Sequence, residues 1–222
     1  MPVVGLTGGI ATGKSAVAGE LQRLGAVVLS ADAAAREVTA PGGPAMPGIV
    51  ARYGSDVLRP DGSLDRAALA ARVFADVEER RALEELTHPH ILRLLRERID
   101  AALHAQPDAI VVVEAPLLYE AGMRPWFDVV VVVAASEETQ VSRLCRLRDM
   151  SHEEALARIR AQWPLPEKVA DADYTVWNDD DPGALPARAG EAMRAIRERL
   201  ARGGDAVPPA EKGACTITTR MI

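Results

Sequence analysis

Near its N-terminus the chain carries a glycine-rich run between an apolar stretch and a helical pattern. Residues Gly8–Ser15, which read Gly-Gly-Ile-Ala-Thr-Gly-Lys-Ser, match G-x-x-x-x-G-K-[S/T] throughout. The apolar residues 3–7 precede the run, and residues 16–21 read as the first turns of a helix. A strand, a glycine-rich turn and a helix N-terminus direct backbone N–H groups at phosphate oxygens. This context predicts a phosphate-binding loop and disfavours the alternative, an ordinary turn with a solvated lysine.

Side chains and backbone of this loop have defined tasks in binding a nucleotide. We expect Lys14 to bridge the β- and γ-phosphates and the Ser15 hydroxyl to ligate Mg²⁺. The expected nucleotide contacts are Gly8, Gly9, Ile10, Ala11, Thr12, Gly13, Lys14, Ser15 and Ala16. The run therefore predicts that the chain binds a nucleoside triphosphate together with Mg²⁺.

Composition narrows the class of protein further. A chain of 222 residues fits one domain with an inserted region. The formal net charge of −6 argues against broad binding to nucleic acid or to an anionic membrane. No secretory signal precedes the first apolar stretch, and the longest apolar runs are too short to span a bilayer. Cys145 and Cys215 show no metal-ligand spacing and are expected to be free thiols. We expect a cytoplasmic enzyme.

Further apolar runs predict the remaining strands. They lie at residues 26–29, 110–113, 129–133 and 174–177, and the last of these is expected at an edge. The two middle runs are continuous and β-branched, as in strands that are buried on both faces of a parallel sheet. Helical patterns alternate with the strands. The predicted fold is α/β, a doubly wound sheet of about five parallel strands, with its ligand site beyond the strand C-termini.

The same pattern gives an expected domain organisation. One domain over residues 1–202 is expected, with its core at about 1–40 and 106–202. Residues 41–105 carry helical patterns without a strong strand, which is more than a simple crossover needs, so we expect an inserted helical acceptor-binding region there. A helical lid is expected at about 143–165. The tail 203–222 has no apolar period and is expected to be disordered.

Helix boundaries follow from breakers and caps. Breaks are expected at Pro41–Pro44 and at His88–Pro89. Ser136 is expected to start one helix, and Ser151 to start another with a capping box. A last amphipathic helix is expected at about 182–201.

Three acidic residues lie near strand ends. Asp32 follows the second strand, and it is expected either to act in catalysis or simply to cap the next helix. Glu114 ends the third strand and is a candidate to orient Mg²⁺ through water, or it is a loop cap. Asp128 begins the fourth strand and is expected to be structural.

A run of arginines follows the fourth strand. One interpretation is a lid that closes cations over the phosphates, because phosphoryl transfer needs its developing charge compensated. The other is a solvated helix face paired with neighbouring glutamates. These residues are Arg143, Arg146, Arg148, Arg158 and Arg160. A zinc-protease motif and a guanine-specific Asn-Lys-x-Asp motif are both absent from the sequence.

Taken together, these stretches resemble the dephospho-CoA kinases over about residues 3–200. The resemblance rests on an ordered set of motifs rather than on the phosphate loop alone. The most specific is Pro-Leu-Leu-Tyr-Glu within residues 114–120. The set comprises Leu6–Ser15, Leu29–Asp32 with Arg36, Leu86–Pro89, Glu114–Glu120, Arg148-Asp149, Arg158-Ile159 with Gln162, and Ala172–Tyr174 leading to Asn178. Two positions depart from the family's usual residues: Ala11 stands where glycine is usual, and Ser30 where aspartate is usual.

The resemblance implies a reaction in which ATP phosphorylates the 3′-hydroxyl of the dephospho-CoA ribose, giving coenzyme A and ADP. It implies catalytic roles for Lys14, Asp32 and Arg148, with Asp32 as the base for the 3′-hydroxyl. It also implies that Arg143 contacts the nucleotide. The residues implied to bind or shape the acceptor site are Asp32, Arg36, His88, Leu117, Leu118 and Glu120, with core packing as the alternative for the two leucines.

Other functions remain open on the sequence alone. A kinase of the same fold with another small acceptor shares the phosphate loop. An ATP-binding regulatory module is a second possibility, with ATP hydrolysis that ignores small acceptors and depends on a protein partner. A nucleic-acid-stimulated ATPase is disfavoured by the acidic net charge. A monomer is the favoured oligomeric state.

Overall fold

The structure is a computed structural model that describes residues 3–179 and 182–202. The chain divides into two compact units. The core unit contains the residues up to Leu29 and those from Ala101 onward, and the helical unit is Ser30–Asp100. The tail that the sequence predicts to be disordered lies outside the described residues, as does Cys215. The thiol of Cys145 is free, as predicted.

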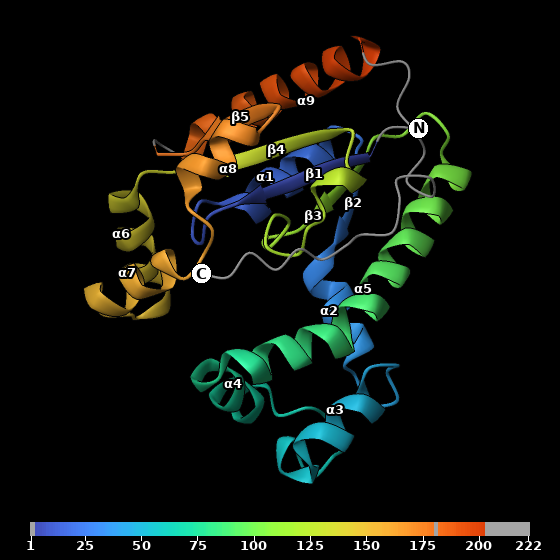
Figure 1. Ribbon diagram of the computed structural model, residues 1–222. Helices are drawn as coiled ribbons and strands as arrows, with labels where there is room; N and C mark the ends of the chain where they lie inside the picture. The colour runs from blue at the N-terminus through green and yellow to red at the C-terminus, as the bar shows by residue number, and fades with distance from the viewer. Residues whose placement is uncertain (1–2, 180–181, 203–222) are drawn as a thin grey trace. The chain divides into compact units, whose positions relative to one another are not determined.

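A five-stranded sheet forms the centre of the core unit (Figure 1). Its order is β2-β3-β1-β4-β5, and β1 runs parallel to β3 and β4 while β4 runs parallel to β5. The strands are β1 (Val3–Gly8), β2 (Val27–Ser30), β3 (Val111–Glu114), β4 (Val129–Ala134) and β5 (Tyr174–Trp177). The predicted α/β fold is confirmed, and so is the edge position of β5.

The β-branched strands explain why this sheet is buried. β1 and β4 are buried along their whole length, and the C-terminal residue of β1, Gly8, pairs with Val133 of β4. On one face, α1 (Lys14–Arg23) and α9 (Leu185–Arg202) contribute Leu21 and Ile196 to the main core. Burial of such aliphatic side chains is the main stabilising contribution to a fold of this kind.

The opposite face of the sheet is closed by a loop and a short helix. A Cβ at Gly5 in β1 would lie 2.6 Å from Leu118 and 2.7 Å from the ring of Phe127, so a larger residue there would displace one or both side chains. Asp128 accepts a hydrogen bond from the N–H of Val3 (2.7 Å), which confirms its predicted structural role. α8 (Leu165–Asp171) packs against β4, and the 3₁₀ turn Arg124–Trp126 contacts β1. A further 3₁₀ turn, Pro182–Ala184, leads into α9.

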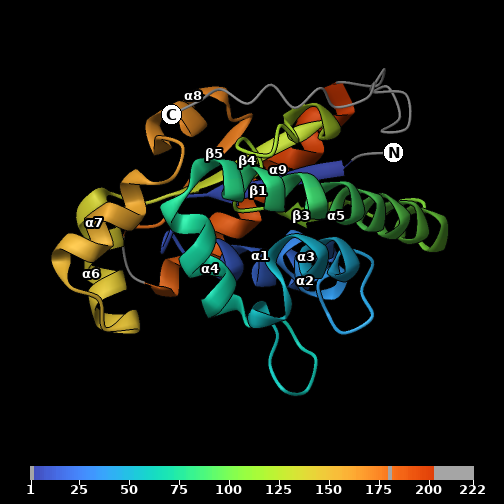
Figure 2. The same ribbon diagram turned by 60° about the horizontal axis from the view of Figure 1, so that its bottom comes forward.

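Two helices follow β4 and pack against each other (Figure 2). α6 (Glu137–Arg148) begins at Ser136, whose hydroxyl accepts the N–H of Thr139. α7 (His152–Arg160) begins with the capping box predicted at Ser151. Both predicted helix starts are confirmed.

The helical unit has its own small core. Its helices are α2 (Ala31–Val38), α3 (Met46–Tyr53), the 3₁₀ turn Ser55–Val57, α4 (Arg66–Ala75) and most of α5 (Val77–Ala105). Ile49, Val57 and their neighbours are buried together in this core. Within the described residues, no helix combines the length and apolarity that crossing a membrane requires.

The helix break predicted at His88–Pro89 is wrong, because α5 continues through Pro89. A proline inside a helix removes one backbone hydrogen bond and costs about 3 kcal/mol. The neighbouring Leu86 and Ile91 pack against the core of the helical unit on either side of the proline. Tertiary packing thus outweighs the local preference of proline, as it often does for helix propensity.

Candidate functional site: the phosphate loop and its supports

The glycine-rich run joins β1 to α1 in a conformation that depends on glycine. Gly13 forms the N-cap of α1 in the left-handed region (φ 89°), and a side chain there would meet the amide of Asn178. Ala11 is also left-handed (φ 59°), a conformation that strains an L-residue with a Cβ. Its methyl group packs against the cluster around Leu144, and that contact partly offsets the strain. The loop therefore accepts the alanine that replaces the family's usual glycine.

Two side chains hold the second half of the loop through its carbonyl groups. Asn178 follows β5 and donates its amide N–H to the carbonyl of Thr12 (2.8 Å). Arg143 on α6 donates to the carbonyls of Ala11 (3.2 Å) and Asn178 (2.7 Å). With these carbonyls engaged by side chains, the loop stays open for an anion at its N–H groups.

Two glutamines hold the first half of the loop. Gln162 accepts the N–H of Ile10 at 2.7 Å. Gln140 donates to the carbonyl of Ala135 (3.0 Å), and its side-chain oxygen would lie 2.7 Å from a Cβ at Gly9. The loop is thus supported by residues from α6, from the end of α7 and from the end of β5.

Lys14 and Ser15 converge on one carboxylate. Ser15 donates its hydroxyl to Oε1 of Glu114 (2.7 Å), and the Lys14 ammonium lies 3.9 Å from the same oxygen. Hydroxyl and carboxylate oxygens are the ligands that Mg²⁺ prefers, and in kinases the substrate phosphates supply more of them. No cluster of three or more acidic, histidine or cysteine side chains suited to a metal occurs among the described residues. Ser15 and Glu114 therefore fit a Mg²⁺ ion that is held partly by the nucleotide.

The two arginines expected in a lid have different surroundings. Arg143 reaches the phosphate loop through the carbonyl of Ala11, and its second hydrogen bond goes to the carbonyl of Asn178. Arg148 is the exposed last residue of α6, and the structure brings it to none of the loop residues through a hydrogen bond. Only Arg143 is therefore placed at the loop within the described part of the core unit.

Asp32 is the second residue of α2 in the helical unit. It does not cap this helix: Ser30 is the N-cap, and its hydroxyl accepts the N–H of Ala33 (3.2 Å). The capping alternative for Asp32 is therefore wrong. Asp32 and Arg36 both have exposed side chains on α2. Within the described chain no hydrogen bond or ion pair engages the Asp32 carboxylate, so it is available to a ligand.

Ser30→Ala is expected to lower the free energy of unfolding by about 1 kcal/mol, because the first turn of α2 loses its side-chain acceptor. Ser30→Asp restores the family's usual residue and is an equally good cap, so it should change stability by less than about 0.5 kcal/mol. Urea unfolding of the two variants beside the unchanged protein measures both effects. Equal losses in the free energy of unfolding for Ser30→Ala and Ser30→Asp would contradict the capping role of Ser30.

The other residues implied to bind the acceptor differ in environment. His88 lies in α5, where burial lowers its pKa against the opposing effect of Glu84, so it is neutral at pH 7. A neutral imidazole donates or accepts hydrogen bonds but brings no cation to a phosphate. Leu117 is exposed (53%), whereas Leu118 is fully buried over Gly5. Leu118 therefore packs in the core, the alternative that the sequence left open for it.

Glu120 is held by two donors from the α7–α8 region. Its Oε1 accepts the ammonium of Lys168 (2.8 Å) and the backbone N–H of Trp163 (3.0 Å). Lys168 is a fully buried residue of α8. The structure thus brings Glu120 to the connection between α7 and α8 within the core unit.

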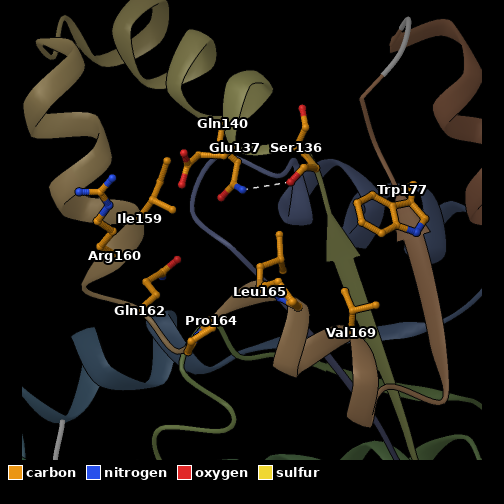
Figure 3. A pocket seen from close by; sticks show the side chains of 12 residues that line it. Ser136, Glu137, Gln140, Ile159, Arg160, Gln162, Pro164, Leu165, Val169 and Trp177 are labelled. Carbon is orange, nitrogen blue, oxygen red and sulfur yellow. Dashed lines mark hydrogen bonds between the residues drawn. The ribbon is translucent and has the colours of Figure 1, made fainter.

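A pocket of about 600 Å³ opens next to two supports of the loop (Figure 3). Gln140, Gln162 and Ile159 lie on one side of it, and Val169 and Trp177 lie on the other. The mixture of apolar and polar lining is typical of small-molecule sites. The full lining is Ala135, Ser136, Glu137, Gln140, Ile159, Arg160, Gln162, Pro164, Leu165, Pro166, Val169 and Trp177.

Sequence reasoning assigned no site role to four residues that the structure places in or next to the supports of the loop. They are Gln140, Gln162, Lys168 and Asn178. Gln162 and Asn178 did stand in the ordered set of family motifs, which was the available signal. Gln140 and Lys168 read as ordinary polar helix residues, because the site residues that they approach, Gly9 and Glu120, are far away in the sequence.

Comparison with known proteins identifies the family of this site. A family model for dephospho-CoA kinase matches residues 2–182. A dephospho-CoA kinase of Anaeromyxobacter dehalogenans is 46% identical over 209 residues, which make up 94% of this chain and 99% of the relative. One from Moorella thermoacetica is 44% identical over 201 residues, covering 90% of this chain and 95% of the relative.

Solved structures have the same fold. TT1252 from Thermus thermophilus superposes with a TM-score of 0.74 at 36% identity, covering 87% of this chain and 96% of that one. The dephospho-CoA kinase from Campylobacter jejuni has the same fold, with a TM-score of 0.59 at 24% identity over 88% of this chain and 97% of that one. The sequence, the fold and the loop thus lead to one conclusion: this chain belongs to the dephospho-CoA kinase family, whose members use ATP to phosphorylate dephospho-CoA in the last step of coenzyme A synthesis.

Proposed function

We propose that the phosphate loop Gly8–Ser15 holds ATP while Asp32 accepts the proton of the 3′-hydroxyl of dephospho-CoA. The observation that carries the donor side is the convergence of Lys14 and Ser15 on Glu114 at the open end of a braced loop. In this proposal Lys14 bridges the β- and γ-phosphates, and the loop's N–H groups bind phosphate oxygens together with the N-terminus of α1.

Ser15 and Glu114 are the residues that would hold Mg²⁺, Ser15 directly and Glu114 through water. Once bound, the ion neutralises negative charge on the phosphate oxygens. Arg143 already lies against the loop, and its guanidinium is expected to lie near the nucleotide. Arg148, exposed at the end of α6, is proposed to meet the phosphates only when the lid helices close.

The acceptor side of the proposal rests on the helical unit. Asp32 and Arg36 lie on one short helix, and both side chains are exposed. A carboxylate suits the acceptor hydroxyl, and an arginine suits a phosphate group of the acceptor. His88, being neutral, is proposed to form hydrogen bonds rather than ion pairs, and Leu117 to contribute apolar contact. The helical unit is thus proposed to carry much of the acceptor site.

Arg36→Ala is expected to raise the KM for dephospho-CoA by about 10–100-fold, because one charge-assisted hydrogen bond is lost. The KM for ATP should stay within about twofold, since ATP is bound by the core unit in this proposal. Steady-state kinetics with each substrate varied in turn measures the split. Arg59→Ala, which removes another exposed arginine of the helical unit, is the matched control. An unchanged KM for dephospho-CoA in the Arg36 variant would refute this assignment.

The same proposal includes a monomeric enzyme in the cytoplasm. All the side chains assigned to ATP and the acceptor come from one chain, so a second copy is not needed to complete the site. ATP is the phosphoryl donor and is kept inside cells, which supports the location. Sedimentation at micromolar concentration tests the oligomeric state.

A further inference from the structure

The motif residue Glu120 is tied by two hydrogen bonds to the segment that runs from the end of α7 into α8. Its side chain is 25% exposed, and Oε1 accepts both of them, one from Lys168 and one from the N–H of Trp163. Tyr119 adds to this junction: its hydroxyl donates to the carbonyl of Lys168 (3.4 Å), and its ring lies 6.4 Å from the ring of Trp163. Residues 119 and 120 thus fix the chain where α7 passes into α8.

Lys168, the charged partner of Glu120, is unusual because a lysine side chain is rarely buried completely. The side chain of Lys168 is 0% exposed. A buried ammonium without a counter-ion is strongly destabilising, whereas a buried pair is often replaceable by apolar residues without loss of stability. Stability alone therefore does not explain a charged pair at this place. Its geometric effect is more specific, because Glu120 can hold Lys168 and the N–H of Trp163 only from one position.

The residue immediately before Trp163 is Gln162, which accepts the N–H of Ile10 in the phosphate loop at 2.7 Å. The position of its backbone decides whether the Gln162 side chain can reach this N–H. The hydrogen bond from the N–H of Trp163 to Glu120 fixes the peptide that joins Gln162 to Trp163. Gln162 in turn sets the orientation of the Ile10 peptide, next to the N–H groups that receive phosphate.

We propose that Glu120 is a positioning residue for ATP: with its buried partner Lys168 it holds the Gln162–Trp163 peptide, and through Gln162 it sets the phosphate loop. The acceptor contact implied for Glu120 by the family resemblance is not required for this role. Loss of the linkage lets the first half of the loop relax. It lowers ATP affinity and leaves dephospho-CoA affinity unchanged.

The direct test is the paired variant Glu120→Leu with Lys168→Met. It removes both charges together and keeps their volume, so the fold should survive with a Tm close to that of the unchanged protein. The KM for ATP is expected to rise about tenfold, with the KM for dephospho-CoA within about twofold. Glu120→Gln keeps an acceptor for the N–H of Trp163 and should retain most of the ATP affinity.

A double-mutant cycle separates positioning from simple stabilisation. Gln162→Leu alone should raise the KM for ATP by a similar factor, and adding it to the Glu120/Lys168 pair should change the KM by less than about twofold. Arg23→Gln breaks another ion pair of the core unit, with Glu20 on α1, and serves as the control with an unchanged KM for ATP. The proposal would be overturned if the paired substitution and Gln162→Leu raised the KM for ATP independently, so that their factors multiply in the combined variant. An unchanged KM for ATP in the folded paired variant would also overturn it. A rise in the KM for dephospho-CoA alone would also overturn it and return Glu120 to the acceptor site.

Discussion

Asp32→Asn is expected to lower kcat by about 10²–10⁴-fold, the usual contribution of a general base. The asparagine side chain has the same shape but does not accept a proton at neutral pH. Because Asp32 is exposed and Ser30 caps the helix, the free energy of unfolding of the variant should lie within about 0.5 kcal/mol of that of the unchanged protein. Stopped assays of coenzyme A formation, at saturating concentrations of both substrates, measure the loss.

Two controls make this result specific. Glu37→Gln removes another carboxylate of α2, one that pairs with Arg98, and should keep kcat within about threefold. Equilibrium binding of ATP and dephospho-CoA to the Asp32 variant should be nearly normal. Normal turnover with both substrates bound would exclude Asp32 as the base.

Lys14→Met is expected to lower kcat by about 10²–10³-fold, as the removal of one preorganised donor from a developing charge does in other enzymes. The ammonium lies at the open end of the loop beside Glu114, where it would meet the β- and γ-phosphates. Methionine keeps the length of the side chain and loses its charge. Rapid-quench measurement of the transfer step separates this loss from weaker ATP binding.

Lys14→Arg keeps the charge but changes its geometry, and it should recover only part of the rate. If Lys14→Met and Lys14→Arg both transferred the phosphoryl group at nearly the normal rate, the backbone of the loop would be enough to stabilise the phosphates during transfer. Such a result would contradict the role proposed for Lys14.

Local patterns predicted the parts of the fold that depend on local sequence. The strand-turn-helix around Gly8–Ser15, the capping box at Ser151 and the β-branched strand β4 follow from neighbouring residues alone, and the structure has all three. The failure at Pro89 has the opposite origin. There a local helix breaker is overridden by packing of α5 in the helical unit.

The supports of the loop were beyond sequence reasoning for a related reason. The hydrogen bond from Ile10 to Gln162 joins positions 152 residues apart, and the one from Asn178 to Thr12 joins positions 166 apart. No periodicity links such positions. The capping role considered for Asp32 was wrong by two positions. Ser30 is an equally good N-cap by residue type, and the structure uses Ser30.

The most direct test of the central claim is ADP release with Mg²⁺-ATP, with and without dephospho-CoA, for the unchanged protein beside Asp32→Asn. We expect release that depends on dephospho-CoA, with coenzyme A as the product carrying the new 3′-phosphate, and loss of that release in the variant. Release that ignores dephospho-CoA, or that follows a different small acceptor, would contradict the claim.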